Sequence, residues 1–164
     1  MPNIHCFFDQ LSRIFDQKSD FEGYFILKND DPDKLSGGSG PRSQHVLPVY
    51  LKIKGDKINL VFTDSRGMVA IDLLLKREAE NFPLKNLVKA INKRYPSAFM
   101  YFLKQGRQSD NSTCPTFALF DIEGMAACPN FLEHVQATAE SPPKEWNTEG
   151  YPYKILDFLA YHLP

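Results

Sequence analysis

The sequence predicts a mixed α+β domain in which helices surround a small mixed sheet. Two kinds of apolar spacing predict this class. Apolar residues alternate with other residues over 45–53, the period of a strand, and recur every three or four residues over 4–15 and 77–95, the period of a helix. At 164 residues, the chain has about the length of one domain and can bury a hydrophobic core without disulfides or metals.

Composition and charge exclude several classes of protein. The 19 lysines and arginines nearly balance the 20 aspartates and glutamates, and the net charge of −1 argues against a nucleic-acid or membrane-surface binder. The longest apolar run, 68–75, contains Asp72 and is too short to cross a membrane. The first residues lack the pattern of a signal peptide, and three cysteines are too few for a disulfide framework. We therefore expect a protein that works in a reducing cytosol.

The first 44 residues are predicted to contain a helix and a flexible loop. The helix covers 4–15, and its apolar stripe is best explained by packing in the core. A short strand over 23–27 follows, and residues 29–44 are polar with a Ser-Gly-Gly-Ser-Gly-Pro sequence at 36–41, typical of a loop. No strand leads into these glycines and no Gly-Lys-Ser follows them, which argues against a phosphate-binding loop.

The rest of the chain is predicted to hold the core and a helical end. A tight turn at Gly55-Asp56 joins the first two strands of the core into a hairpin. Residues 68–75 are consistent with either a strand or a helix, and a proline-rich loop surrounds 142–143. The elements in order are strands over 45–53 and 57–63, a helix over 77–95, a strand over 98–103, and helices over 116–127, 131–138 and 155–162. We expect one catalytic domain over 1–164, divided into 1–44, a catalytic core over 45–127, and C-terminal helices over 128–164.

Cys114 is the strongest candidate for a chemical role. It follows a polar run, 105–113, and precedes a predicted helix whose first turn holds Pro115, a residue suited to the start of a helix. The partial positive charge of a helix N-terminus favours a thiolate, the nucleophilic form of cysteine. A free cysteine that only fills space in the core is the alternative, and position alone does not separate the two. Cys6 and Cys128 lie in or beside apolar helical stripes, where that structural role is favoured.

A nucleophilic thiol normally needs a base and a group that orients the base. His45 stands at the start of a strand after the flexible loop, whereas the other three histidines lie in predicted helices. Asp64 follows the partner strand, so a hairpin that turns at Gly55 brings His45 and Asp64 to the same end. Singly, a solvated histidine and a turn-forming aspartate also fit these positions. Together they predict an imidazole beside a carboxylate.

Metal binding has little support in the sequence. No Cys-x-x-Cys or His-x-x-x-His pair occurs, and the adjacent His5 and Cys6 lie on the first helix, too close to its apolar face for a zinc site. The remaining potential ligands have no recognised spacing; they are His45, Cys114, Cys128 and His134. We expect no metal.

The order His, acid, Gln, Cys resembles the clan CE cysteine enzymes, which include proteases of ubiquitin-like proteins and the bacterial YopJ-family effectors. The segments that carry the resemblance are His45-Val-Leu-Pro-Val-Tyr50, Leu60-Val-Phe-Thr-Asp-Ser65 and Gln108-Ser-Asp-Asn-Ser-Thr-Cys114. It covers 45–127 and implies a papain-like cysteine protease core. It also implies that His45 is the base, Asp64 orients it, and Cys114 is the nucleophile. Gln108 would then line the oxyanion hole, with Gln105 as the alternative.

The 19-residue interval from His45 to Asp64 and the serine-containing run before Cys114 resemble the YopJ family more than the proteases. That resemblance implies transfer of an acetyl group from acetyl-CoA to Ser, Thr or Lys of a host protein. It implies inositol hexakisphosphate as an activator, although the bases here are scattered and the densest group is Lys89, Lys93 and Arg94. It further implies delivery into the host cytoplasm by a bacterial secretion system, a route that needs no signal peptide.

Two alternatives remain open. In the first, the same residues form a clan CE cysteine protease that attacks the C-terminal glycine carbonyl of ubiquitin or a ubiquitin-like protein. In the second, the chain is a catalytically inactive binding module. Pro115 motivates this second alternative, because the clan usually has glycine there and proline has no N–H to bind an oxyanion. Val46 also stands where many clan proteases have tryptophan.

Overall fold

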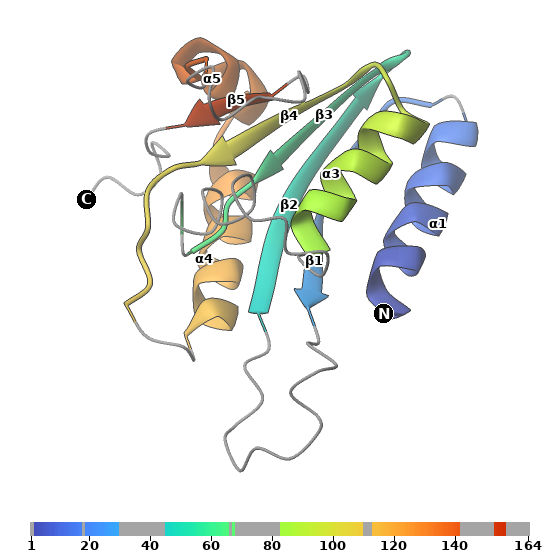
Figure 1. The fold of residues 1–164 in the computed structure, drawn as a ribbon. Helices are drawn as coiled ribbons and strands as arrows, with labels where there is room; N and C mark the ends of the chain where they lie inside the picture. The colour runs from blue at the N-terminus through green and yellow to red at the C-terminus, as the bar shows by residue number, and fades with distance from the viewer. Residues whose placement is uncertain are drawn as a thin grey trace, which may run out of the picture.

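The structure of the protein is a computed structural model, shown in Figure 1. Its described part contains four helices and five strands. The structure describes residues 2–17, 19–29, 45–65, 67, 83–109, 113–141 and 153–156. The helices are α1 (Pro2–Asp16), α3 (Pro83–Arg94), α4 (Cys114–Ala127) and α5 (Phe131–Thr138). The strands are β1 (Phe21–Asn29), β2 (His45–Lys54), β3 (Lys57–Phe62), β4 (Ala98–Leu103) and β5 (Tyr153–Leu156).

All five strands join in a single mixed sheet, and they follow chain order across it from β1 to β5. β2 is antiparallel to both of its neighbours, β1 and β3, whereas β4 is parallel to both β3 and β5. The predicted α+β class, a small mixed sheet surrounded by helices, is therefore confirmed.

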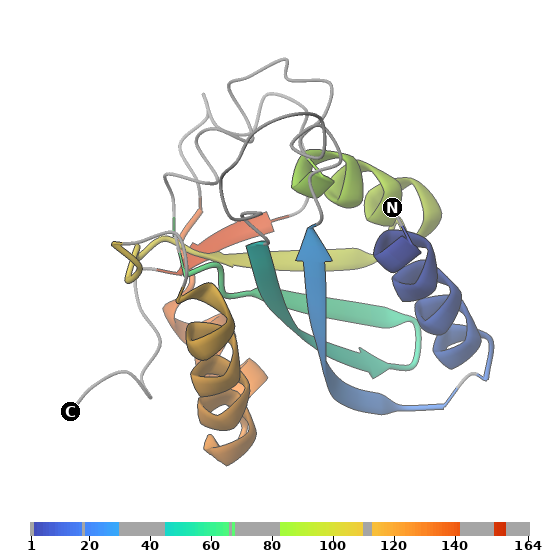
Figure 2. The same ribbon diagram turned by 90° about the horizontal axis from the view of Figure 1, so that it is seen from below.

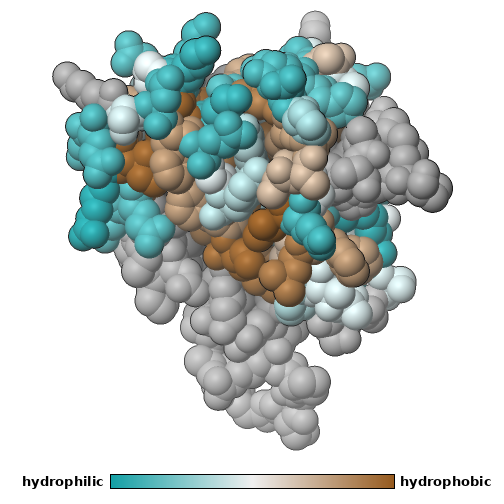
Figure 3. All heavy atoms as spheres, turned by 180° about the vertical axis from the view of Figure 1, so that it is seen from behind, coloured by the Kyte–Doolittle hydropathy of each residue, from teal (hydrophilic) through white to brown (hydrophobic). Residues whose placement is uncertain are grey.

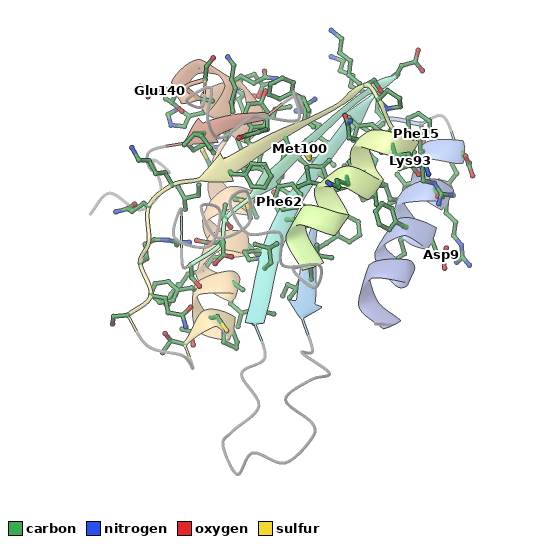
Figure 4. The ribbon with its side chains drawn as sticks, in the orientation of Figure 1. Asp9, Phe15, Phe62, Lys93, Met100 and Glu140 are labelled. Carbon is green, nitrogen blue, oxygen red and sulfur yellow. The ribbon has the colours of Figure 1, made fainter. Side chains whose placement is uncertain are left out.

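Helices cover both faces of the sheet (Figures 1 and 2). α1 and α3 lie on one face, and α4 and α5 lie on the other. Because successive residues of a strand point to opposite faces, each of the central strands supplies side chains to two separate cores. The core under α1 and α3 includes Phe62 and Met100 (Figure 4), and the core under α4 and α5 includes Tyr50, Val61 and Met125.

The predicted hairpin is confirmed. β2 pairs with β3 from Val49 opposite Phe62 to Lys54 opposite Lys57. Gly55 in the turn has a φ of 56°, a left-handed conformation that glycine adopts with little strain. The helices and strands predicted over 4–15, 23–27, 98–103 and 131–138 are also confirmed, as α1, β1, β4 and α5. The helix predicted over 77–95 is present from Pro83, and the one predicted over 116–127 begins two residues earlier, at Cys114.

The closing helix predicted over 155–162 is wrong at its start. Residues 155 and 156 belong to β5, which pairs in parallel with β4 so that Met100 lies opposite Tyr153. β5 supplies buried side chains to both faces of the sheet, and a short apolar run of this kind lacks the alternation that separates a strand from a helix. Of the C-terminal helices predicted over 128–164, α5 is therefore present and the start of the last is a strand. Other predicted segments lie outside the described residues: 30–44, 68–75, 77–82, 142–143 and 157–162.

Apolar surface gathers near the middle of the face that carries α4 and α5 (Figure 3). Among the described residues, the large apolar side chains that remain exposed are Ile26 on β1 and Leu119 and Phe120 on α4. None of the described helices combines the length and apolar character that crossing a membrane would require.

Candidate active site

α4 begins at Cys114, with Pro115 in its first turn. The carbonyl of the preceding residue, Thr113, accepts a 3.1 Å hydrogen bond from the N–H of Phe117, which closes the first turn of the helix. Proline fits here because the first N–H groups of a helix have no partner within the helix. The prediction that Cys114 lies at a helix N-terminus is therefore confirmed.

The buried stripe of α4 determines where Cys114 faces. Its buried positions are spaced four, three and four residues apart, so they share one side of the helix; they are Cys114, Ala118, Asp121 and Met125. α4 packs against β2, and Met125 enters the core on that face of the sheet. Cys114 thus faces inward with this stripe, and its side chain is only 1% exposed.

His45 is the first residue of β2, where it pairs with Asn29 of β1. β2 and α4 both begin at the lower end of the molecule in Figure 1, so the backbones of His45 and Cys114 lie at the same end. The side chain of His45 lies outside the described part of the structure. The prediction that His45 is the base stays a prediction.

Asp64 lies two residues beyond the end of β3 and is buried, with 5% of its surface exposed. The N–H of Thr63 still donates to the carbonyl of Pro48 at 3.4 Å, so the hairpin pairing extends past the end of β3. Continuing this register places Asp64 level with Leu47, two residues along β2 from His45. The backbone thus brings the predicted base and the predicted acid to one end of the hairpin.

Gln108 is tied to the turn that follows β3. The carbonyl of Ser65 accepts hydrogen bonds from the N–H groups of Arg107 and Gln108, at 2.8 and 2.9 Å. The Ser65 hydroxyl donates to Oε1 of Gln108 at 2.6 Å. Gln105, the alternative, is exposed, whereas Gln108 is half-buried, and the role of either glutamine in an oxyanion hole stays a prediction.

The parallel pairing of β3 with β4 explains why these two segments meet. Parallel strands end at the same edge of a sheet, so the turn after β3 and the loop after β4 leave side by side. Gly67 makes the close approach possible. Its φ is 61°, its N–H donates to the carbonyl of Asp64 at 2.9 Å, and a Cβ atom here would meet the backbone of residues 104–106.

Arg107 was not identified as a structural residue from the sequence. Its guanidinium donates to both carboxylate oxygens of Asp121 on α4, at 2.6 and 2.7 Å, and to the carbonyl of Thr63, at 3.3 Å. Its carbon Cζ lies 5.4 Å from the centre of the Phe117 ring, in the first turn of α4. Arg107 therefore connects the residue before Asp64 to the helix that begins at Cys114.

One signal for this ion pair was present in the sequence. Asp121 is an acidic residue on the apolar stripe of a helix, between Ala118 and Met125, and it is 0% exposed. A buried carboxylate needs a cationic or hydrogen-bonding partner, so a carboxylate at such a position indicates that a partner reaches it. The partner could not be identified from the sequence, because Arg107 stands in a polar run typical of solvated loops.

Within the described ranges, no cluster of three or more His, Cys, Asp or Glu side chains is placed to hold a metal ion. Cys114 and Cys128 carry free thiols, the first buried and the second partly exposed. What this arrangement supplies is a thiol at the start of a helix, and Arg107 links that helix to the turn that holds Asp64.

No protein-family profile matches the chain, and a search of curated proteins finds no match. A search of solved structures finds the selenomethionine form of the ASFV pS273R protease, with a TM-score of 0.36 and 14% sequence identity. The match covers 79% of this chain and 44% of the protease chain, so the chain spans less than half the length of that protein. At this TM-score, the likeness assigns neither a family nor an activity to the chain.

Proposed function

We propose that this protein is a clan CE-like cysteine protease that cleaves a peptide or isopeptide bond of a protein substrate through a thioester on Cys114. The observation that carries the proposal is the connected set of hydrogen bonds around Arg107. These hydrogen bonds join the turn that holds Asp64, the loop that holds Gln108 and the helix that begins at Cys114. These are the elements that an acyl-transfer site has to hold in register.

In the proposed reaction, His45 accepts the proton of the Cys114 thiol while Asp64 orients its imidazole. The thiolate attacks the carbonyl carbon of the scissile bond, forming a C–S bond and a negatively charged oxygen. The amide of Gln108 and the backbone N–H of Cys114 donate hydrogen bonds to that oxygen. The C–N bond then breaks, and the leaving amine takes the proton from His45. Water, deprotonated by His45, hydrolyses the thioester and restores the thiol.

The position of the basic residues favours hydrolysis over acetyl transfer. Acetyl-CoA carries phosphate groups, which basic residues within reach of the nucleophile would have to bind. The densest group of basic residues named in the sequence analysis lies on α3, where Lys93 and Arg94 occupy the last turn. α3 covers the face of the sheet opposite α4 (Figures 1 and 4), so a phosphate group bound there would be separated from Cys114 by the sheet.

Covalent labelling tests the nucleophile and the reaction type together. Wild type, Cys114→Ala and the matched control Cys128→Ala are incubated with p-nitrophenyl acetate, with ubiquitin carrying a C-terminal propargylamide, and with acetyl-CoA with or without inositol hexakisphosphate. Intact mass then gives the adducts. We expect acylation by p-nitrophenyl acetate in wild type and Cys128→Ala, and none at this site in Cys114→Ala. A propargylamide adduct identifies a ubiquitin-type substrate, whereas an acetyl adduct from acetyl-CoA overturns the protease assignment in favour of the transferase predicted from the sequence.

A catalytically inactive binding module is the second candidate, and two observations favour it. The Cys114 side chain is 1% exposed, and a nucleophile has to reach its substrate. Pro115 also removes an N–H from the helix start, where an oxyanion would bind. Folded wild-type protein that forms no adduct at Cys114 with any of the three labelling reagents would favour this candidate and overturn the enzyme.

A further inference from the structure

We infer that Ser65 is a positioning residue that fixes the side-chain amide of Gln108 in the orientation needed to bind the developing oxyanion. The inference rests on the proposed function, because it assigns a role to a neighbour of the proposed oxyanion hole. It concerns a residue that does not itself contact the substrate.

The chemistry of a glutamine amide carries the argument. Its oxygen only accepts hydrogen bonds and its NH₂ group only donates, and the two point to opposite sides of the amide carbon. The Ser65 hydroxyl donates to Oε1 of Gln108 at 2.6 Å, which holds the oxygen on the side of the β3 turn. The NH₂ group is thereby directed away from that turn. An amide rotated by half a turn would present its oxygen to a negative charge and oppose the reaction.

Two further contacts bring the loop that holds Gln108 to α4. Arg107, the residue before Gln108, lies over the ring of Phe117 in the first turn of α4. The same Arg107 binds Asp121, about one turn further along the helix. The loop that holds Gln108 is therefore attached to the first part of α4, the helix that begins at Cys114.

The burial of Ser65 favours a specific role for its hydroxyl. The residue is 2% exposed, so its hydroxyl has little access to solvent and makes its hydrogen bond within the protein. Its carbonyl separately accepts the N–H groups of Arg107 and Gln108, and these bonds persist when the side chain is shortened. Ser65→Ala thus removes the contact to Oε1 and leaves the backbone contacts between the two segments in place.

Two reagents separate positioning of the amide from general damage to the site. Acylation of Cys114 by p-nitrophenyl acetate passes through an oxyanion, whereas its alkylation by iodoacetamide does not. We expect Gln108→Ala to slow acylation by about 10²-fold and Ser65→Ala to slow it by about tenfold. Both variants should alkylate at the wild-type rate, with the adduct assigned to Cys114 by peptide mass spectrometry. If Ser65→Ala slows both reactions equally, the residue is structural and the inference is overturned.

A double variant and a matched control complete the test. If Ser65 acts through Gln108, then Ser65→Ala combined with Gln108→Ala acylates no more slowly than Gln108→Ala alone, whereas an additional tenfold loss overturns the inference. Ser97→Ala is the control, because the Ser97 hydroxyl also donates a hydrogen bond, to the carbonyl of Asp56 at 2.8 Å, at an exposed position. We expect it to behave as wild type. Absence of acylation in wild type defeats the proposed function itself, whereas normal acylation in Ser65→Ala defeats only the inference.

Discussion

Arg107 and Asp121 form a bidentate ion pair in the interior, with both carboxylate oxygens within 2.7 Å of a guanidinium nitrogen. Asp121 is fully buried, and the Arg107 side chain is 9% exposed. Each of these two charges offsets the cost of burying the other. The pair thus holds the loop after β4 against α4. It thereby also helps to fix the position of the start of α4.

Replacing Asp121 by asparagine should destabilise the fold severely, because the guanidinium then stays buried without its counter-charge. We expect Asp121→Asn to lower the free energy of unfolding by about 3–5 kcal/mol in urea denaturation. The control is Lys52→Met, which removes partly exposed ion pairs to Glu22 and Glu133 at 3.5 and 3.7 Å. That change should cost at most about 1 kcal/mol. Equal losses in the two variants would contradict the role given to the buried pair.

Gly67→Ala should be much more harmful than Gly55→Ala. Both glycines have a positive φ, 61° and 56°, so alanine strains the backbone by about 1 kcal/mol at either site. At Gly67 the new Cβ would also lie about 2.5 Å from backbone atoms of residues 104–106, whereas at Gly55 nothing lies within 4 Å. Thermal unfolding should therefore show a clearly larger fall in Tm for Gly67→Ala. Similar falls would mean that the loop after β4 moves aside freely.

The predicted base and acid should differ in their effects on acylation of Cys114. We expect His45→Ala to slow the reaction with p-nitrophenyl acetate by about 10²–10⁴-fold, because the general base is lost. Asp64→Asn should slow it less, because it disturbs the orientation of the imidazole and leaves the base in place. His134→Ala, at an exposed position on α5, is the control and should react as wild type. A normal rate in His45→Ala would remove His45 from the site.

Stability should fall above pH 10 because buried tyrosines resist ionisation. Burial raises the pKa of Tyr153 to about 12. It also raises the pKa of Tyr50, whose hydroxyl in addition donates to Glu22 at 2.8 Å. Tyrosines in the unfolded chain lose their protons near pH 10, so between pH 10 and 12 the unfolded state binds fewer protons and is favoured.

Urea denaturation at pH 8, 10 and 11.5 measures this loss. We expect the free energy of unfolding of wild type to fall between pH 10 and pH 11.5. The free energy of unfolding of Tyr153→Phe should fall less steeply over the same interval. The stability that neutral Tyr153 supplies is fully present below pH 10, so the two proteins should differ in slope only above it. Parallel curves for the two proteins would show that Tyr153 ionises freely in the fold.

Periodicity made much of the fold predictable from the sequence. The hairpin of β2 and β3, the helix α5 and the helix start at Cys114 each follow from local patterns, because strand alternation and helix-start residues act over a few positions. The backbone proximity of His45 and Asp64 follows as well, since a tight turn fixes the register of both strands.

Contacts between distant segments could not be predicted in this way. β5 has one polar residue, Lys154, and is otherwise apolar without regular alternation, because it supplies buried side chains to both cores. The partnership of Arg107 with Asp121, and that of Ser65 with Gln108, depend on the parallel pairing of β3 and β4. Nothing in the residues around Ser65 indicates which distant amide it will reach.

The parallel pairing also has a consequence for the order of events in folding. The hairpin of β2 and β3 closes locally, on a timescale of about 1–10 μs for such units. The hydrogen bond from Ser65 to Gln108 spans 43 residues, so it cannot form until the chain between them has crossed over and β4 has docked. We expect the site to be among the last parts of the protein to assemble. Hydrogen exchange at the backbone N–H of Gln108 would then report completion of the whole fold. Partly folded chains would have the Cys114 thiol but not the assembled site around it.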